Sequence, residues 1–298
     1  MAGAADPPSL EKQVGLRPLP VKVLESISPD IFNHFFRSRA PVVFKGFVKA
    51  WKPCQMWTPL YLKTRLGETC QTLSVMVSHD NERFVDNNDF TSRKMLTAEE
   101  MINAVFESNL NNRPENQRLY FRSSSMPTAL HNDICIDSQM RELFDKVSPI
   151  VATESGDDEN NFEQFVSAIF RQHTTQLWVG TAGNITPLHY DRNHGLLMQI
   201  RGQKKIILFS TEDTNFLYPF PGYSEKSHIS KVNLRDVNVN VFPKFVETQP
   251  YCCLINKGDM LYIPPFWWHD VTSLDNCVSV TLSWDISGLH EIPLQMLR

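Results

Sequence analysis

The stretch GNITPLHYDRNHG, residues 183–195, lies in a part of the chain whose pattern is typical of β-strands. His189 and Asp191 are two positions apart in it, and residues i and i+2 of a strand point to the same side of the sheet. One imidazole and one carboxylate could therefore face a single cation. An HxD pair also arises by chance, so the alternative is that both are ordinary polar residues.

Short apolar segments separated by turn residues surround this stretch. They are TQLWVGT (175–181), LLMQIRG (196–202), KKIILFS (204–210), YCCLIN (251–256), DMLYIP (259–264) and CVSVTLSW (277–284). Repeated short strands between turns favour a β-sandwich or barrel. We therefore predict a mainly β protein with flanking helices, in which Arg201-Gly202-Gln203 forms the turn of a hairpin.

Helix signals occur in the N-terminal half. SPDIFNHFFRS (28–38) begins with a serine N-cap followed by proline, and TAEEMINAVFES (97–108) opens with the capping-box pair Thr97 and Glu100. Further helices are predicted over TPLYLKTRLGE (58–68), where Gly67 should end the helix, and over SQMRELFDKV (138–147).

These elements predict how the chain is organised. Residues 1–20 are expected to be a flexible lead-in and 21–298 a single domain. Within it, a helical and strand part (21–150) is followed by an acidic loop at about 151–164 and a β core at about 165–285.

The composition is that of a globular protein. Hydrophobic residues make up 42%, and 29 basic against 33 acidic residues leave a net charge of −4, which gives no general attraction to nucleic acid. The six cysteines show no CxxC spacing that would indicate structural zinc. Neither a signal peptide nor a membrane span is visible. We expect an intracellular protein, cytoplasmic and/or nuclear, with no membrane partner.

A third metal ligand should come from another strand. YIPPFWWHDV (262–271) supplies His269, which follows a strand ended by the rigid Pro264-Pro265 pair. Two histidines and one carboxylate leave open coordination positions, as in non-haem Fe(II) oxygenases. His194, five positions after His189, lies off the ligand face and is predicted to be a loop residue.

Lys204 is a candidate for a buried positive charge. Lys204 shares one strand face with Ile206 and Leu208, and if that face is interior, Lys204 is a cation in an apolar barrel. Such a burial is unfavourable unless an anion pairs with it. A protein carboxylate and a dicarboxylate co-substrate both remain open, and Lys205 should point outward.

Several motifs together resemble one family. TPLHYD (186–191), QIRGQKKIILFS (199–210), GDMLYIPPFWWHDV (258–271) and VSVTLSW (278–284) resemble the JmjC (cupin-like) Fe(II)- and 2-oxoglutarate-dependent oxygenases. The subgroup most similar is that of the small hydroxylases, such as the asparaginyl hydroxylase that inhibits hypoxia-inducible factor. The resemblance covers about residues 40–285 and implies a double-stranded β-helix (jelly-roll) core.

The resemblance also implies a set of site residues. His189, Asp191 and His269 match the iron ligands of the family, whereas Lys204, Thr186 and Tyr120 match residues that bind the distal carboxylate of 2-oxoglutarate. Ser283 sits where some relatives carry Asn or Ser near the co-substrate. One position departs from the family: Gly195 stands where many relatives have an asparagine, and Asn193 is the candidate replacement.

The implied activity is that of a dioxygenase. With Fe(II), 2-oxoglutarate and O₂ it would hydroxylate a C–H bond, most often in a protein side chain. The open alternatives are hydroxylation of a wybutosine-type tRNA nucleoside, lysine demethylation and a non-catalytic cupin-fold interaction protein. A homodimer is a further open alternative. A zinc hydrolase fits less well, because it would leave Lys204 without its anion.

Overall fold

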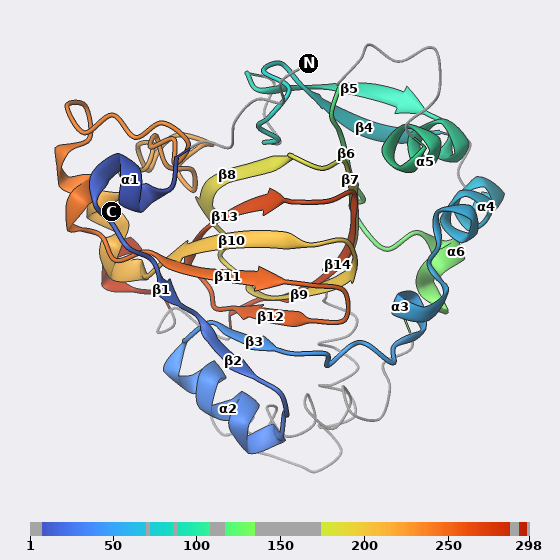
Figure 1. The fold of residues 1–298 in the computed structure, drawn as a ribbon, viewed down its shortest axis with the longest axis horizontal. Coiled ribbons are helices and arrows are strands. Elements are labelled where there is room, and N and C mark those ends of the chain that lie inside the picture. The colour runs from blue at the N-terminus through green and yellow to red at the C-terminus, as the bar shows by residue number, and fades with distance from the viewer. Residues whose placement is uncertain are drawn as a thin grey trace.

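A computed structural model describes residues 8–69, 72–85, 89–107, 117–134, 174–286 and 292–296. Its centre is a pair of β-sheets that lie over one another (Figure 1). The five-stranded sheet has the order β1 (Leu19–Pro20), β11 (Tyr251–Ile255), β10 (Lys204–Phe209), β13 (Trp268–Ser273) and β8 (Ile185–Tyr190). The predicted fold class, mainly β with a jelly-roll core, is confirmed.

The second sheet is larger and continues into the N-terminal part of the chain. It has nine strands in the order β2 (Lys22–Leu24), β3 (Val42–Phe44), β12 (Met260–Ile263), β9 (His194–Arg201), β14 (Cys277–Trp284), β7 (Thr174–Gly180), β6 (Leu119–Arg122), β4 (Leu73–Ser78) and β5 (Thr91–Leu96). N-terminal strands therefore extend both edges of the core sheet.

The predicted hairpin at residues 201–203 is wrong. Gly202 does take the left-handed conformation of a turn, with φ +73°. However, β9 pairs with β12 and β14, whereas β10 pairs with β11 and β13. The turn thus carries the chain from one sheet to the other. Turn residues specify that a chain reverses, but the available partner strands decide with which strand it pairs.

The interior between the sheets is apolar. Ile206 and Leu208 of β10 pack there with Leu197 of β9 and Ile263 of β12, and all four are buried. The predicted inward face of β10 is confirmed, since Lys204 is also buried while Lys205 on the other face is partly exposed. A separate and larger core lies between the nine-stranded sheet and the helices.

The helices flank the sheets. They are α1 (Leu10–Val14), α2 (Pro29–Ser38), α3 (Lys52–Met56), α4 (Pro59–Thr69), α5 (Ala98–Phe106) and α6 (Thr128–His131), of which α4, α5 and α6 gather at one end of the molecule (Figure 1). The predicted caps at Ser28 and at Thr97 with Glu100 are present. Gly67 does not end its helix, since α4 continues through it to Thr69; a glycine in a helix costs only about 1 kcal/mol.

Part of the predicted lead-in is packed. Leu10 of α1 is buried, and the Gln13 side chain donates to the Leu234 carbonyl. The division of the chain into a lead-in and a single domain stays a prediction. The acidic loop at about 151–164 and the helix over 138–147 lie outside the described residues. No helix in the described ranges has the length and apolarity needed to cross a membrane.

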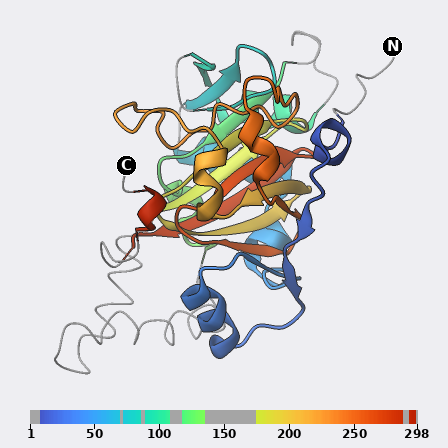
Figure 2. The same cartoon turned by 90° about the vertical axis from the view of Figure 1, so that its left-hand side faces the viewer.

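The segment between β10 and β11 covers the outer side of the five-stranded sheet (Figure 2). It contains the 3₁₀-helices η1 (Thr211–Phe216) and η2 (Pro243–Glu247). Asp213 of η1 is buried, and its carboxylate accepts hydrogen bonds from the Gln249 amide, at 3.4 Å, and from the Ser210 backbone, which do not offset the desolvation. Burial therefore raises the pKa of Asp213 to about 6.

The raised pKa of Asp213 predicts that the free energy of unfolding depends on pH. The pKa of Asp213 in the folded state lies above the unfolded value of 3.8. Its contribution to the free energy of unfolding is therefore fully present below about pH 4 and is lost as the pH rises through about 6. Asp213→Asn stays neutral, so its unfolding free energy relative to the native protein should increase by about 2–3 kcal/mol between pH 4 and pH 8. Urea unfolding at both pH values measures this. Asp236→Asn, at an exposed carboxylate, is the control, and a pH-independent difference for Asp213→Asn would contradict the prediction.

Candidate metal centre

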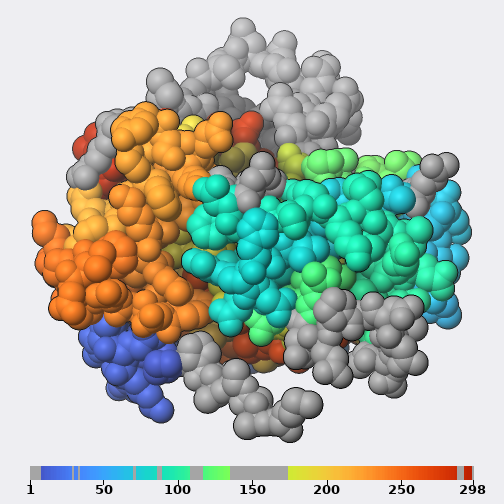
Figure 3. All heavy atoms as spheres, turned by 90° about the horizontal axis from the view of Figure 1, so that it is seen from above, coloured from blue at the N-terminus to red at the C-terminus, as the bar shows by residue number. Residues whose placement is uncertain are grey.

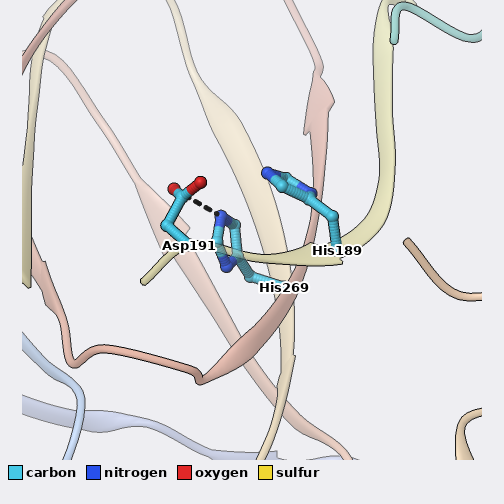
Figure 4. A group of neighbouring side chains, drawn as sticks. All are labelled: His189, Asp191 and His269. Carbon is cyan, nitrogen blue, oxygen red and sulfur yellow. Dashed lines mark ion pairs between the residues drawn. The ribbon is translucent and has the colours of Figure 1, made fainter. Parts of the chain in front are cut away.

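Two neighbouring strands bring the predicted histidines together. β8 and β13 are antiparallel, and His189 lies directly opposite His269 with the ring centroids 4.2 Å apart. Asp191 follows the end of β8, and its Oδ2 is 3.7 Å from His269 Nε2 (Figure 4). One potential ligand atom from each of the three residues lies within 4.8 Å of the other two. The structure thus gathers the predicted ligand set from two strands.

A bulge in β8 lets Thr186 and His189 face the same side of the sheet. His269 pairs with His189 and Val271 with Thr186, so two steps along β13 match three steps along β8. Without the extra residue, Thr186 and His189 would face opposite sides, because side chains alternate along a strand. Both instead line the same pocket. Pro187 lies within the bulge, where its missing N–H removes no ladder hydrogen bond.

Backbone carbonyls orient both imidazoles. His189 Nδ1 is 2.7 Å from the Pro187 oxygen, and His269 Nδ1 is 2.9 Å from the Trp267 oxygen. A carbonyl oxygen can only accept, so each Nδ1 donates its proton there, and Nε2 is the nitrogen whose lone pair a neutral imidazole offers to a metal ion. This is the usual support of a metal-binding histidine. The donor set is then two imidazole nitrogens and a carboxylate.

The surroundings of His189 and Asp191 favour the protonation states in which these side chains bind a metal ion. Burial, together with the neighbouring His269, lowers the pKa of His189 to about 4. The Asp191 side chain is largely exposed, and although desolvation by the surrounding protein atoms would raise its pKa, the neighbouring imidazoles and the Arg122 guanidinium lower it overall. At neutral pH the set therefore combines a neutral imidazole at His189 with an ionised carboxylate at Asp191, as metal coordination requires.

A pocket of about 390 Å³ extends from these residues into the barrel. All seven residues predicted for the site line it: His189, Asp191, His269, Lys204, Thr186, Tyr120 and Ser283. They come from β6, β8, β10, β13 and β14 and from the segment after β8, so only the folded chain brings them together. Their individual roles stay predictions.

Lys204 is the unusual charge in this pocket. Its side chain is among the largest that are fully buried, with 2% of the residue exposed, and its Nζ lies 5.9 Å from the centre of the Tyr120 ring. No carboxylate of the described residues forms an ion pair with it. A buried ammonium without a counter-ion is costly, which points to an anionic ligand at this end of the pocket.

Gly195, the position that departs from the family pattern, has open space where a side chain would lie. A Cβ there would meet only the Ile263 carbonyl oxygen, 3.8 Å away, so the backbone does not require glycine. Asn193, the candidate replacement, also lines the pocket, but its side-chain amide donates to the Asp285 carboxylate. Ser283, which pairs with Gly195 across the sheet, donates to the Thr174 carbonyl at 3.3 Å.

The prediction of His194 as a loop residue is wrong. His194 begins β9 and is 1% exposed, and its Nδ1 lies 2.9 Å from the Tyr262 hydroxyl. Its ring stacks on Phe36 and Trp284, with centroids 4.6 and 5.1 Å away. These partners are far apart in the sequence, and no local pattern shows that they meet.

His194 should therefore matter for stability and not for metal binding. Replacing His194 by alanine removes the stacking and a hydrogen-bond partner of the buried Tyr262 hydroxyl, and we expect the free energy of unfolding in urea to fall by about 2–4 kcal/mol. Iron content per protein chain should stay at the native level. His34→Ala, at an exposed histidine of α2, is the control. Loss of iron at unchanged stability would instead place His194 in the metal site.

Two segments meet at the mouth of the pocket. Lys226, from the segment after β10, forms an ion pair with Asp89 and lies over the rings of Phe90 and Phe220, 5.6 and 5.7 Å from their centres. Figure 3 shows the cyan segment that carries β4 and β5 next to the orange segment after β10. No local sequence pattern links residues 89 and 226, so this contact cannot be predicted from the sequence.

Comparison with known sequences now identifies the family. The model of the cupin-like domain family matches residues 28–288. The chain belongs to this family. It is similar to lysine-specific demethylase 8 of Xenopus tropicalis, with 26% identity over 85% of this chain and 49% of that protein. It is also similar to JmjC domain-containing protein D of Dictyostelium discoideum, with 28% identity over 83% and 52%.

A third relative matches a shorter stretch more closely. Lysine-specific demethylase JMJ30 of Arabidopsis thaliana is 42% identical over 36% of this chain and 25% of that protein. Even in the longer alignments, this cupin-like chain spans about half the length of its curated relatives. These names confirm the resemblance to JmjC cupin oxygenases, a family that generally uses Fe(II) and 2-oxoglutarate.

Proposed function

We propose that this cupin-like chain is an Fe(II)- and 2-oxoglutarate-dependent dioxygenase that hydroxylates a C–H bond in a protein side chain. The observation that supports it best is one pocket that holds both the His189–Asp191–His269 cluster and the buried Lys204, which has no ion-pair partner in the part of the chain that the structure describes. A metal site alone would suit many functions. The additional buried cation is explained by an anionic co-substrate that binds beside the metal.

The residues present fit such a centre. Two nitrogen donors and one carboxylate are the ligand set of non-haem Fe(II) oxygenases, and hydrogen bonds from both Nδ1 atoms fix the imidazoles. When bound, iron and 2-oxoglutarate would supply the oxidation of a C–H bond by O₂, with release of succinate and CO₂. The chain would contribute Lys204, Thr186 and Tyr120 as carboxylate-binding groups, and apolar walls that limit access of water.

A second candidate is lysine demethylation. Two of the relatives described above are named lysine-specific demethylases, and demethylation can proceed by hydroxylation of an N-methyl group. The RNA hydroxylase and homodimer hypotheses have no support beyond the sequence. The non-catalytic alternative predicts neither metal nor co-substrate binding.

Binding is tested first. Fe(II) and 2-oxoglutarate together should raise the melting temperature of the chain more than either alone, and succinate should form slowly without substrate. Candidate protein substrates are then analysed by mass spectrometry: a gain of one oxygen atom indicates hydroxylation, and loss of a methyl group indicates demethylation. A chain that neither binds iron nor responds to 2-oxoglutarate would refute the proposal and favour the non-catalytic alternative.

A further inference from the structure

One cation of the pocket, Arg122, makes no ion pair or side-chain hydrogen bond with the described residues, although its charge helps to lower the pKa of Asp191. Among the described residues that line the pocket, Lys204, Lys226 and Arg122 carry permanent positive charges. Lys204 is assigned to the co-substrate, and Lys226 is paired with Asp89. Arg122 forms neither an ion pair nor a side-chain hydrogen bond within the part of the chain that the structure describes.

Arg122 is nevertheless held in place. It ends β6, pairs with Trp178 of β7 across the sheet, and lies with its guanidinium carbon 5.4 Å from the centre of the Trp178 ring. Stacking on an aromatic face pre-organises a guanidinium and leaves its N–H groups free to donate. Tyr120, two residues earlier on the same strand face, lies beside the co-substrate lysine. Arg122 therefore lines the pocket beyond the predicted co-substrate site, two residues past Tyr120 along β6.

A second donor at this place is also unused. Trp178 lines the pocket, and its indole Nε1 is buried without a hydrogen-bond acceptor among the described residues. A buried donor without an acceptor costs roughly 1–3 kcal/mol, and such groups are rare in native proteins. The Nε1 atom has almost no accessible surface, however, so Arg122 is the donor at this place that a ligand in the pocket can reach.

We propose that Arg122, stacked on Trp178, is a specificity-determining residue that binds a carboxylate of the primary substrate. The pocket would then select a protein segment with an aspartate or glutamate at, or next to, the oxidised residue. This inference rests on the proposed function. A planar guanidinium matches a planar carboxylate through two parallel hydrogen bonds.

The chemistry favours an acidic peptide over RNA. Proteins bind RNA largely by neutralising several phosphates in a row. Here Arg122 is the one cation of the described pocket lining left for a substrate, and Asp191 and Glu225 line the same pocket. A single pre-organised guanidinium in such surroundings suits one carboxylate and not a polyanion.

A binding selection tests this without turnover. The full chain is loaded with Mn(II) and the 2-oxoglutarate analogue N-oxalylglycine, and loading is measured first. Randomised acetylated heptapeptides and randomised short RNAs are then captured on the loaded protein, on Arg122→Glu, on Arg122→Gln and on Lys94→Glu. Lys94 is exposed on β5 outside the pocket, so its variant matches the charge change.

The native chain and Lys94→Glu should enrich Asp or Glu at one peptide position by about tenfold. Arg122→Gln should lose this preference, and Arg122→Glu should reverse it towards Lys or Arg. Loading without acidic enrichment, or equal enrichment by Arg122→Gln, would overturn the subsite. Enrichment of RNA that depends on Arg122 would assign it to a phosphate and overturn the peptide proposal. Failure to load would instead refute the proposed function.

Discussion

Asp191→Ala is expected to abolish iron binding and 2-oxoglutarate turnover. Asp191 supplies the only carboxylate of the cluster formed by the described residues, and two histidines alone bind Fe(II) weakly. Loss of a hydrogen-bonding partner of a metal ligand already costs about 10–100-fold in affinity or activity, so loss of a ligand should exceed about 100-fold. Iron per chain by elemental analysis and succinate formation measure the two effects.

Asp191→Ala should not unfold the protein. The Asp191 side chain is 67% exposed and its ion-pair contact is with His269 of the cluster, so the melting temperature without metal should change little. Asp236→Ala, at an exposed carboxylate remote in sequence from the cluster, should keep native iron content and turnover. Full iron content with full turnover in Asp191→Ala would remove this residue from the metal site.

Lys204→Met should have the second-largest effect. Methionine has a similar length without the charge, so the variant loses the proposed partner of the 2-oxoglutarate carboxylate. Removing one partner of a buried ion pair costs about 3–5 kcal/mol, which corresponds to an affinity loss of about 100-fold or more. Iron content should remain native, since the ligand cluster is untouched. Titration of 2-oxoglutarate followed by the melting temperature measures the change.

The neighbouring lysine is a matched control. Lys205 lies on the opposite face of β10 and is partly exposed, so Lys205→Met should change the co-substrate affinity by a few-fold at most. Without ligands, Lys204→Met should be at least as stable as the native chain, because it removes a buried charge that has no counter-ion among the described residues. Native 2-oxoglutarate affinity in Lys204→Met would contradict the assignment of Lys204.

Local signals predicted much of the fold. The capped helices α2 and α5 and most of the core strands are present where the sequence indicates them. The period of two along β10 correctly placed Lys204 inside and Lys205 outside. These features depend on neighbours within a few residues, which is why a single sequence reveals them. The predicted helix end at Gly67 is wrong, because the helix-propensity penalty of a glycine, about 1 kcal/mol, does not outweigh tertiary packing.

Sequence alone therefore determined which residues could be ligands: an HxD pair, a later histidine, and an inward lysine. Only the tertiary structure decided how they meet. The pairing of β8 with β13 brings His189 opposite His269, and the bulge at Pro187 turns Thr186 into the same pocket. Pairing also places Arg122 on Trp178 and buries His194 among distant aromatic rings. Such contacts join residues tens of positions apart, whose proximity depends on the packing of the whole chain and not on any local pattern.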